Sequence, residues 1–158
     1  MEHFWRHNPN GGGFQPHPDT LVIHTMGEFV VGDDGKVRHA TEHLEHDGTS
    51  VHAMITPTGT TIRTREDDRV AYHCRGHNAN SLSVEVLCAG VHDWSSLVKT
   101  IKTDYVKPVQ FAELVRFVLG WRDRYHIKQI KRHSDLDPKK PDVGSGFHWE
   151  RFLKEVAI

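Results

Sequence analysis

The chain has 158 residues, of which 37% are apolar and 26% charged, and its formal net charge is −1. This length and composition are typical of one soluble globular domain with its own core. The balanced charge argues against a nucleic-acid partner or an anionic membrane surface, and no apolar run approaches the roughly 20 residues that cross a membrane.

The first half of the chain predicts an irregular arm followed by short strands. Residues 1–19 contain three consecutive glycines and several prolines, which break regular structure. The apolar run 20–25 includes a histidine near its end and is typical of a buried strand. A short helix is expected over 37–46. The segments 51–57 and 60–64 flank a Thr-Gly turn and predict a hairpin.

The second half predicts one central strand and two helices. Residues 82–87 form a strand in which Glu85 lies among apolar neighbours, where a carboxylate is costly unless it is paired or used. Residues 108–125 begin with proline and repeat apolar side chains every three or four positions, as an amphipathic helix does. The segment 93–106 fits a helical seam but is rich in Ser, Thr and Lys. The other expected elements are an extended piece at 70–74, a strand at 129–131 and a closing helix at 148–156.

This order of elements predicts a single α/β domain with a mixed central β-sheet flanked by helices. We assign residues 1–19 to an N-terminal arm and residues 20–158 to the domain itself, and we expect a monomer. The N-terminus lacks the basic start and apolar run of a secretory signal, which predicts a cytoplasmic location without membrane insertion.

Histidine is frequent, with 14 copies, so position rather than number has to identify candidate ligands. His39-Ala-Thr-Glu-His43 matches the H-x-x-E-H motif of inverted zinc peptidases, which requires a sustained helix. Flanking Asp-Gly turns leave room for about three helical turns, so we interpret this match as chance. Cys74 and Cys88 lack the spacing of a Cys-x-x-Cys zinc site and are expected to be buried thiols.

Potential metal ligands are concentrated in the segment 132–149. A catalytic zinc site uses three nitrogen, sulfur or carboxylate ligands and keeps a fourth position open. His24 and His133 each lie at the end of a predicted strand, so neighbouring strands would bring both rings to one sheet edge. Asp142 follows on a loop long enough to reach the same metal, and Lys140 would face the same side. An ordinary strand-end histidine and a solvated loop are the alternatives.

Five motifs, in order, resemble those of the zinc-dependent N-acetylmuramoyl-L-alanine amidases, the family of bacteriophage T7 lysozyme, the muropeptide amidase AmpD and the peptidoglycan recognition proteins. The resemblance covers roughly residues 20–153. The motifs are Leu-Val-Ile-His-Thr (21–25), Ser-Val-His-Ala-Met-Ile (50–55), Ala-Tyr-His-Cys (71–74), Asn-Ser-Leu-Ser-Val-Glu (80–85) and the stretch from His133 to Trp149.

The resemblance implies an amidase fold and a set of roles for particular residues. His24, His133 and Asp142 would hold Zn²⁺, which activates water. Glu85 would take the proton of that water and return it to the leaving amine. Lys140 would stabilise the negative charge that develops on the carbonyl oxygen.

The resemblance also places His52, His73 and Asn80 in the lining of the substrate cleft, although core packing is an equal alternative for the two histidines. In T7 lysozyme a catalytic tyrosine precedes the hairpin histidine. Here that position is Val51, so the general-base task would fall to Glu85. Two further departures from the family pattern are Tyr-His-Cys-Arg at 72–75 and Asp-Val-Gly at 142–144.

The implied function is hydrolysis of the amide bond between N-acetylmuramic acid and L-alanine of peptidoglycan. We expect a phage endolysin that is made in the host cytoplasm and reaches the cell wall after release by another protein. A cytoplasmic amidase that recycles muropeptides is one alternative, and a non-catalytic peptidoglycan-binding or regulatory module is another. Asp142 argues against the last, because family members that only recognise peptidoglycan tend to lack the third ligand.

Overall fold

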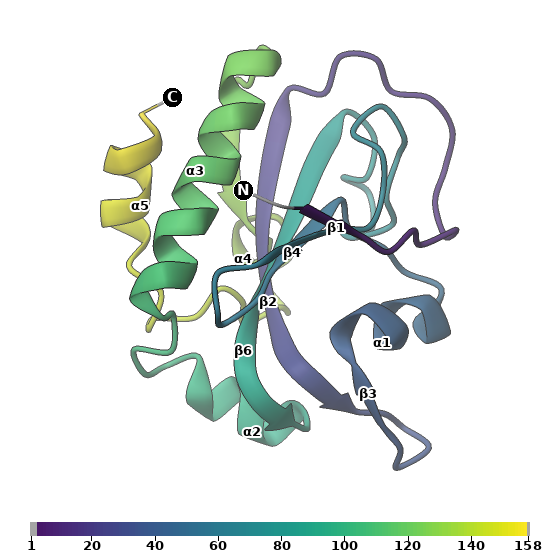
Figure 1. Cartoon of the computed structure of the whole chain (residues 1–158), viewed down its shortest axis with the longest axis vertical. Coiled ribbons are helices and arrows are strands. Elements are labelled where there is room, and N and C mark those ends of the chain that lie inside the picture. Colours follow the sequence, from purple (N-terminus) through teal and green to yellow (C-terminus); the bar gives the residue numbers. More distant parts are fainter. Residues whose placement is uncertain (1–2, 158) are drawn as a thin grey trace.

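The computed structural model describes residues 3–157, which form one mixed β-sheet with helices on both faces (Figure 1). The strand order is β1-β5-β4-β6-β2-β3, and β7 pairs with the first part of β2. The strands are β1 (His3–Trp5), β2 (Thr20–Val31), β3 (Val37–His39), β4 (Ala53–Ile55), β5 (Thr61–Arg63), β6 (Ser81–His92) and β7 (Gln129–Arg132). The predicted α/β fold with a mixed central sheet is confirmed.

Two long parallel strands, β2 and β6, form the centre of the sheet. Each has 12 residues and extends well beyond the predicted runs at 20–25 and 82–87. The pairing brings His24 directly beside Glu85. Because side chains alternate along a strand, these two residues point to the face opposite that of Ile23 and Val84, which lie in the main core.

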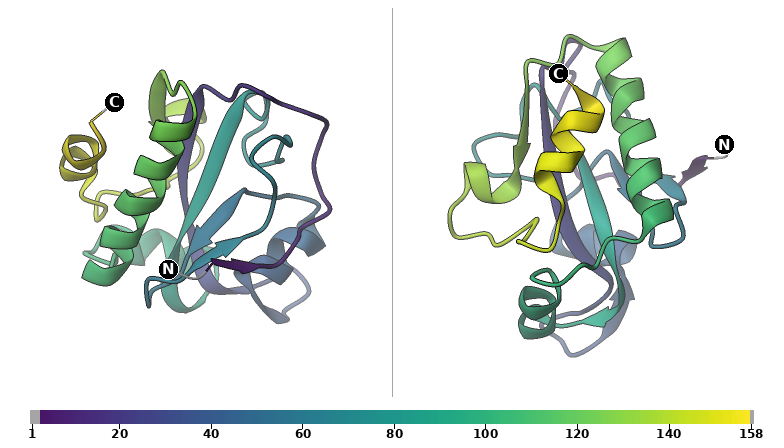
Figure 2. Two further views of the ribbon diagram at one scale, coloured as in Figure 1. Left: turned by 45° about the horizontal axis from the view of Figure 1, so that its top comes forward. Right: turned by 90° about the vertical axis from the view of Figure 1, so that its left-hand side faces the viewer.

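The helices cover the sheet unequally. Helices α3 and α5 lie side by side over one face, whereas α1 lies over the other (Figures 1 and 2). Helix α3 starts at Pro108, whose fixed φ suits a first helical turn, and α1 ends at Gly48, whose φ of 75° is a left-handed cap. The helices are α1 (Ala40–Asp47), α2 (Trp94–Thr100), α3 (Pro108–Arg124), α4 (His133–Leu136) and α5 (Trp149–Val156).

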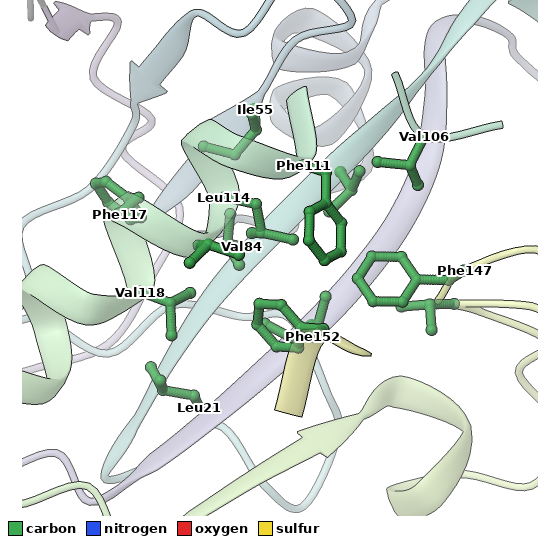
Figure 3. Close-up of a cluster of buried hydrophobic side chains, with 14 of the residues drawn as sticks. Leu21, Ile55, Val84, Val106, Phe111, Leu114, Phe117, Val118, Phe147 and Phe152 are labelled. Atoms are coloured by element: carbon green, nitrogen blue, oxygen red, sulfur yellow. The ribbon is translucent and has the colours of Figure 1, made fainter. Parts of the chain in front are cut away.

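The main hydrophobic core fills the space between the sheet and helices α3 and α5 (Figure 3). Phe152 of α5 is fully buried and packs edge-on against Phe111 of α3, with ring centroids 6.4 Å apart. Phe147 joins the same cluster from the loop before α5. This packing holds the last third of the chain, which carries two of the candidate metal ligands, against the central strands.

The arm at residues 3–19 is bound to the domain rather than loose. Strand β1 pairs with β5 in parallel, which the sequence does not predict. Farther along, the buried Asn8 side chain donates to the Thr49 carbonyl at 3.0 Å, and that of Gln15 donates to the Ser81 carbonyl at 2.8 Å. The arm therefore connects the outer end of the sheet to its centre.

Three predicted segments differ from the structure or are resolved by it. Residues 70–74 form an irregular connection rather than an extended strand, and the ambiguous segment 93–106 contains the short helix α2. Residues 37–46, predicted as a helix, begin instead as the short strand β3 and become helical at Ala40. Within residues 3–157, no helix combines the length and apolar character that crossing a bilayer requires.

Candidate active site

The side chains of His24 and Glu85 lie in an open cleft of about 610 Å³ on the face of the sheet away from α3 and α5. Helix α1 contributes one wall through His43 and Asp47, and the segment around His73 contributes another. Other lining residues come from α2, from the start of α4 and from the loop after α4, and include Trp94, Leu97, His133, Asp137, Lys140 and Asp142.

Three predicted metal ligands converge at one point in this cleft. The Nδ1 atoms of His24 and His133 lie 3.1 Å apart, and Asp142 Oδ2 lies 3.1 Å from His133 Nδ1 and 3.7 Å from His24 Nδ1. One potential ligand atom from each residue lies within 4.8 Å of the others. The sheet achieves this because β7 pairs with β2, so that His133, directly after β7, lies next to His24.

The geometry and chemistry of this cluster fit a small divalent cation. A tetrahedral ion with ligand bonds of about 2.0–2.1 Å requires ligand atoms roughly 3.3 Å apart, close to the separations observed. Burial, together with the neighbouring His73, His133 and Lys140, holds the pKa of His24 well below its usual range, so its ring is neutral and can offer a lone pair. The carboxylate of Asp142 could supply an anionic ligand.

The loop that carries Asp142 is fixed by neighbouring segments. The backbone N–H of Thr25 donates to Asp142 Oδ2 at 3.1 Å, and the Tyr105 hydroxyl donates to the Val143 carbonyl at 2.8 Å. Gly146 approaches the backbone of Thr103 so closely that a Cβ atom there would lie 1.6 Å from the carbonyl oxygen. Valine in place of the family's proline therefore leaves a loop that is still held in place by contacts on both sides.

Glu85 lies at the floor of the cleft, buried at 7% exposure. Its Oε2 atom has no hydrogen-bond partner among the described residues. Burial, followed by the charge of Asp142, raises the pKa of Glu85 well above its usual range. A buried carboxylate with a free oxygen and a raised pKa, next to a cluster of ligands, has the properties of a group that exchanges protons with a substrate or water.

Lys140 also lines the cleft, in the exposed loop between α4 and Asp142. Its positive charge is close enough to His24 to contribute to the lowered pKa of that ring. Its amino group makes no hydrogen bond or salt bridge with the other residues between 3 and 157. An amino group in this place can approach an oxygen that becomes negative during a reaction.

The structure brings together only some of the residues predicted to line the cleft. His73 lines it and contacts His24, with His24 Nε2 2.9 Å from His73 Nδ1. His52 is instead fully buried beneath the sheet face, and Asn80 lies on an exposed turn with a φ of 58°. Asn78, which the sequence prediction missed, lines the cleft and accepts two backbone N–H bonds.

His52 is a structural histidine whose protonation is fixed by the backbone. The Ser83 N–H donates to His52 Nδ1 at 3.1 Å, so the proton lies on Nε2 and is donated to the Arg69 carbonyl at 2.8 Å. Burial lowers the pKa of His52 from 6.5 to about 4. The ring therefore remains neutral in the folded protein at pH values where it would be protonated in the unfolded chain.

This lowered pKa predicts a loss of stability on acidification. Between about pH 6.5 and 4 the unfolded chain binds a proton at His52 and the folded chain does not, so the free energy of unfolding falls by up to about 3 kcal/mol. Urea unfolding at several pH values across this range, with chelator present, measures how steeply the free energy of unfolding depends on pH. His52→Gln should reduce the slope by one proton's share, about 1.4 kcal/mol per pH unit. An unchanged slope in this variant would contradict the assignment.

The other motifs noted in the sequence have structural roles. His39 caps helix α1, with its Nδ1 accepting the Thr41 N–H at 3.1 Å, and this excludes a zinc-peptidase arrangement with His43 four residues later. Cys74 and Cys88 are both buried free thiols, as predicted.

The fold and the ligand cluster define an α/β protein with a potential metal centre in an open cleft. Residues 14–145 match the family model described as N-acetylmuramoyl-L-alanine amidase. The match covers most of the chain, and the chain therefore belongs to this family. Its activity is hydrolysis of the amide bond between N-acetylmuramic acid and L-alanine of peptidoglycan.

Solved structures show the same fold. The endolysin N-acetylmuramoyl-L-alanine amidase LysCS from Clostridium intestinale URNW aligns with a TM-score of 0.75 and 20% identity, covering 99% of this chain and 96% of the other. An AmpD structure aligns with a TM-score of 0.70 and 22% identity, covering 98% and 94%. A chain from the complex of peptidoglycan recognition proteins LCa and LCx with tracheal cytotoxin aligns with a TM-score of 0.68 and 14% identity, covering 98% of this chain and 95% of the other. Curated protein sequences give no match.

Proposed function

We propose that this amidase depends on zinc and that His24, His133 and Asp142 hold the ion. The observation that carries the proposal is the convergence of two imidazole nitrogens and one carboxylate oxygen beside the buried Glu85. Two histidines and a carboxylate form a common zinc ligand set in hydrolases, and the open cleft leaves room for water and substrate at a fourth position.

The protein's own groups account for proton transfer and charge stabilisation. A zinc ion, when bound, would supply a Lewis acid that activates water and polarises a carbonyl group. The free oxygen of Glu85 receives a proton from the attacking water and passes it to the leaving amine nitrogen of L-alanine. Lys140, from the exposed loop, stabilises the charge that develops on the lactyl carbonyl oxygen.

The proposed substrate is intact peptidoglycan in a phage lysis system, where the enzyme would act as an endolysin. The similarity to LysCS, whose description names it an endolysin, supports this role. The similarity to AmpD keeps a muropeptide-recycling amidase as the second candidate. In the endolysin role the protein is made in the host cytoplasm and acts on the cell wall after another protein releases it. We assign catalysis to the domain at residues 20–158, and the N-terminal arm contributes contacts that hold this domain together.

Mass spectrometry of digested substrate tests these proposals together. Purified wall and soluble muropeptides are incubated with the enzyme, with and without chelator, and the products are compared. We expect free stem peptides that begin with L-alanine, their loss with chelator, and their return on addition of Zn²⁺. Faster release from intact wall supports the endolysin role, and faster release from muropeptides supports recycling. Cleavage that persists after complete metal removal would overturn the zinc proposal.

A further inference from the structure

A row of hydrogen-bonded side chains extends from His24 through the half-buried His73 to the buried Ser81. His24 Nε2 lies 2.9 Å from His73 Nδ1, and His73 Nε2 lies 2.7 Å from the hydroxyl of Ser81. Ser81 is the first residue of β6, and its side chain is 1% exposed. These contacts join the first ligand to a serine that has no place in the proposed chemistry.

The Ser81 hydroxyl can have only one role toward His73. Its oxygen lies 2.9 Å from the carbonyl of His77 and 2.9 Å from that of Asn78. Carbonyl oxygens accept hydrogen bonds and cannot donate them, so the hydroxyl proton must point toward these two atoms. The lone pairs of the hydroxyl oxygen are then left to accept a hydrogen bond from the Nε2–H of His73.

The hydrogen bond from His73 to Ser81 also fixes which nitrogen of His24 carries the proton. In its neutral form each imidazole carries one N–H, and only one hydrogen fits between His24 Nε2 and His73 Nδ1, which lie 2.9 Å apart. With its proton on Nε2, His73 can only accept at Nδ1, and the N–H that it accepts is the Nε2–H of His24. The Nδ1 atom of His24 is therefore left without a proton, and this is the atom that faces His133 and Asp142.

We propose that Ser81 is a positioning residue which, through His73, selects the ring nitrogen of His24 that is free to bind metal. The inference rests on the proposed zinc site and extends it by naming two residues behind the ligand. Hydrogen bonds to the remote nitrogen of a ligating histidine fix its tautomer and ring orientation, and their loss typically weakens metal binding about 10–100-fold.

The chain contains a matched control for Ser81. Ser83 lies two residues farther along β6, is fully buried, and its hydroxyl contacts the ring of a histidine, His52, at 3.1 Å. That ring is bonded to the Arg69 carbonyl and not to a candidate ligand. Ser81→Ala and Ser83→Ala thus remove the same group from the same strand, but only the first change affects the row that leads to His24.

The test measures zinc affinity by competition with a chromophoric chelator in the full chain. We expect Ser81→Ala to bind Zn²⁺ about 10–100-fold more weakly than wild type, with Ser83→Ala near wild type. Nitrogen-detected NMR of the histidine rings should show His73 protonated at Nε2 in wild type and a mixture of tautomers in Ser81→Ala. Equal zinc affinity in the two alanine variants would overturn the proposal.

A second pair of variants keeps the test decisive if Ser81→Ala fails to fold. Asparagine at position 73 retains an acceptor where His73 Nδ1 lies, whereas leucine has a similar size and no acceptor. We expect His73→Asn to bind Zn²⁺ at least about 10-fold more tightly than His73→Leu. Equal affinity of this pair would also overturn the role of the row. If the wild-type protein binds no zinc, the proposed metal site itself is wrong. If the wild-type protein binds zinc and the variants bind it with equal affinity, only the positioning role of Ser81 and His73 is wrong.

Discussion

Glu85→Gln should lower kcat about 10²–10⁴-fold while its zinc content stays equal to that of wild type. Glutamine has nearly the same shape but cannot take a proton from water at neutral pH. Glu85 lies beside His24 but is not one of the three proposed metal ligands. The substitution therefore leaves the cluster of two histidines and one aspartate in place. Release of stem peptide from purified substrate gives the rate, and elemental analysis gives the metal content.

Two features separate this result from a general loss of structure. Removing a buried carboxylate with a raised pKa also removes its burial cost, so Glu85→Gln should unfold at the same temperature as wild type or higher. Glu150→Gln, on α5 at the opposite face of the sheet, serves as the control and should leave kcat unchanged. Near wild-type turnover in Glu85→Gln would assign the proton transfer to another group.

Asp142→Ala should abolish both zinc retention and activity. The substitution removes one of the three proposed ligand atoms. It also leaves the Thr25 N–H without its acceptor, which costs roughly 1–3 kcal/mol. Two neutral imidazoles provide no negative charge to balance the cation. Elemental analysis after gel filtration, with wild type in parallel, gives the zinc content per chain.

Asp135→Ala is the matched control for this experiment. Asp135 lies in the same segment and pairs with Arg132 at 2.9 Å rather than with the ligand cluster. It should therefore keep full zinc and near wild-type activity. Full zinc occupancy in Asp142→Ala would refute the ligand role of Asp142 and direct attention to Asp137, another carboxylate of the cleft lining.

The central part of the site could be predicted because it depends on local rules. The strands at 20–25 and 82–87 follow from apolar runs, and alternation within them sets His24 and Glu85 apart from the core. That these strands are neighbours in register does not follow from either strand alone. The strand-end positions of His24 and His133 and the loop of Asp142 allow the three to meet, but the resemblance to a family was needed to favour this ligand set over an ordinary strand-end histidine and a solvated loop.

The predictions that differ from the structure concern residues whose place depends on long-range contacts. His52 and His73 occur in similar short motifs, but one side chain is enclosed by β6 and the arm, whereas the other reaches the cleft. Asn80 and Asn78 are two residues apart in a polar loop, and only the turn geometry decides which side chain faces inward. No periodicity distinguishes such positions. The row from Ser81 to His24 likewise becomes visible only when β2 and β6 are paired.

The short strand β1 has a consequence for how this protein behaves at high concentration. It lies against β5, which would otherwise be the outermost strand and would offer its free N–H and C=O groups to another molecule. With only three residues, β1 is itself too short to template a further strand. The arm thus protects the sheet from edge-to-edge aggregation, and a shortened chain that begins at β2 would lose that protection along with the contacts of Asn8 and Gln15.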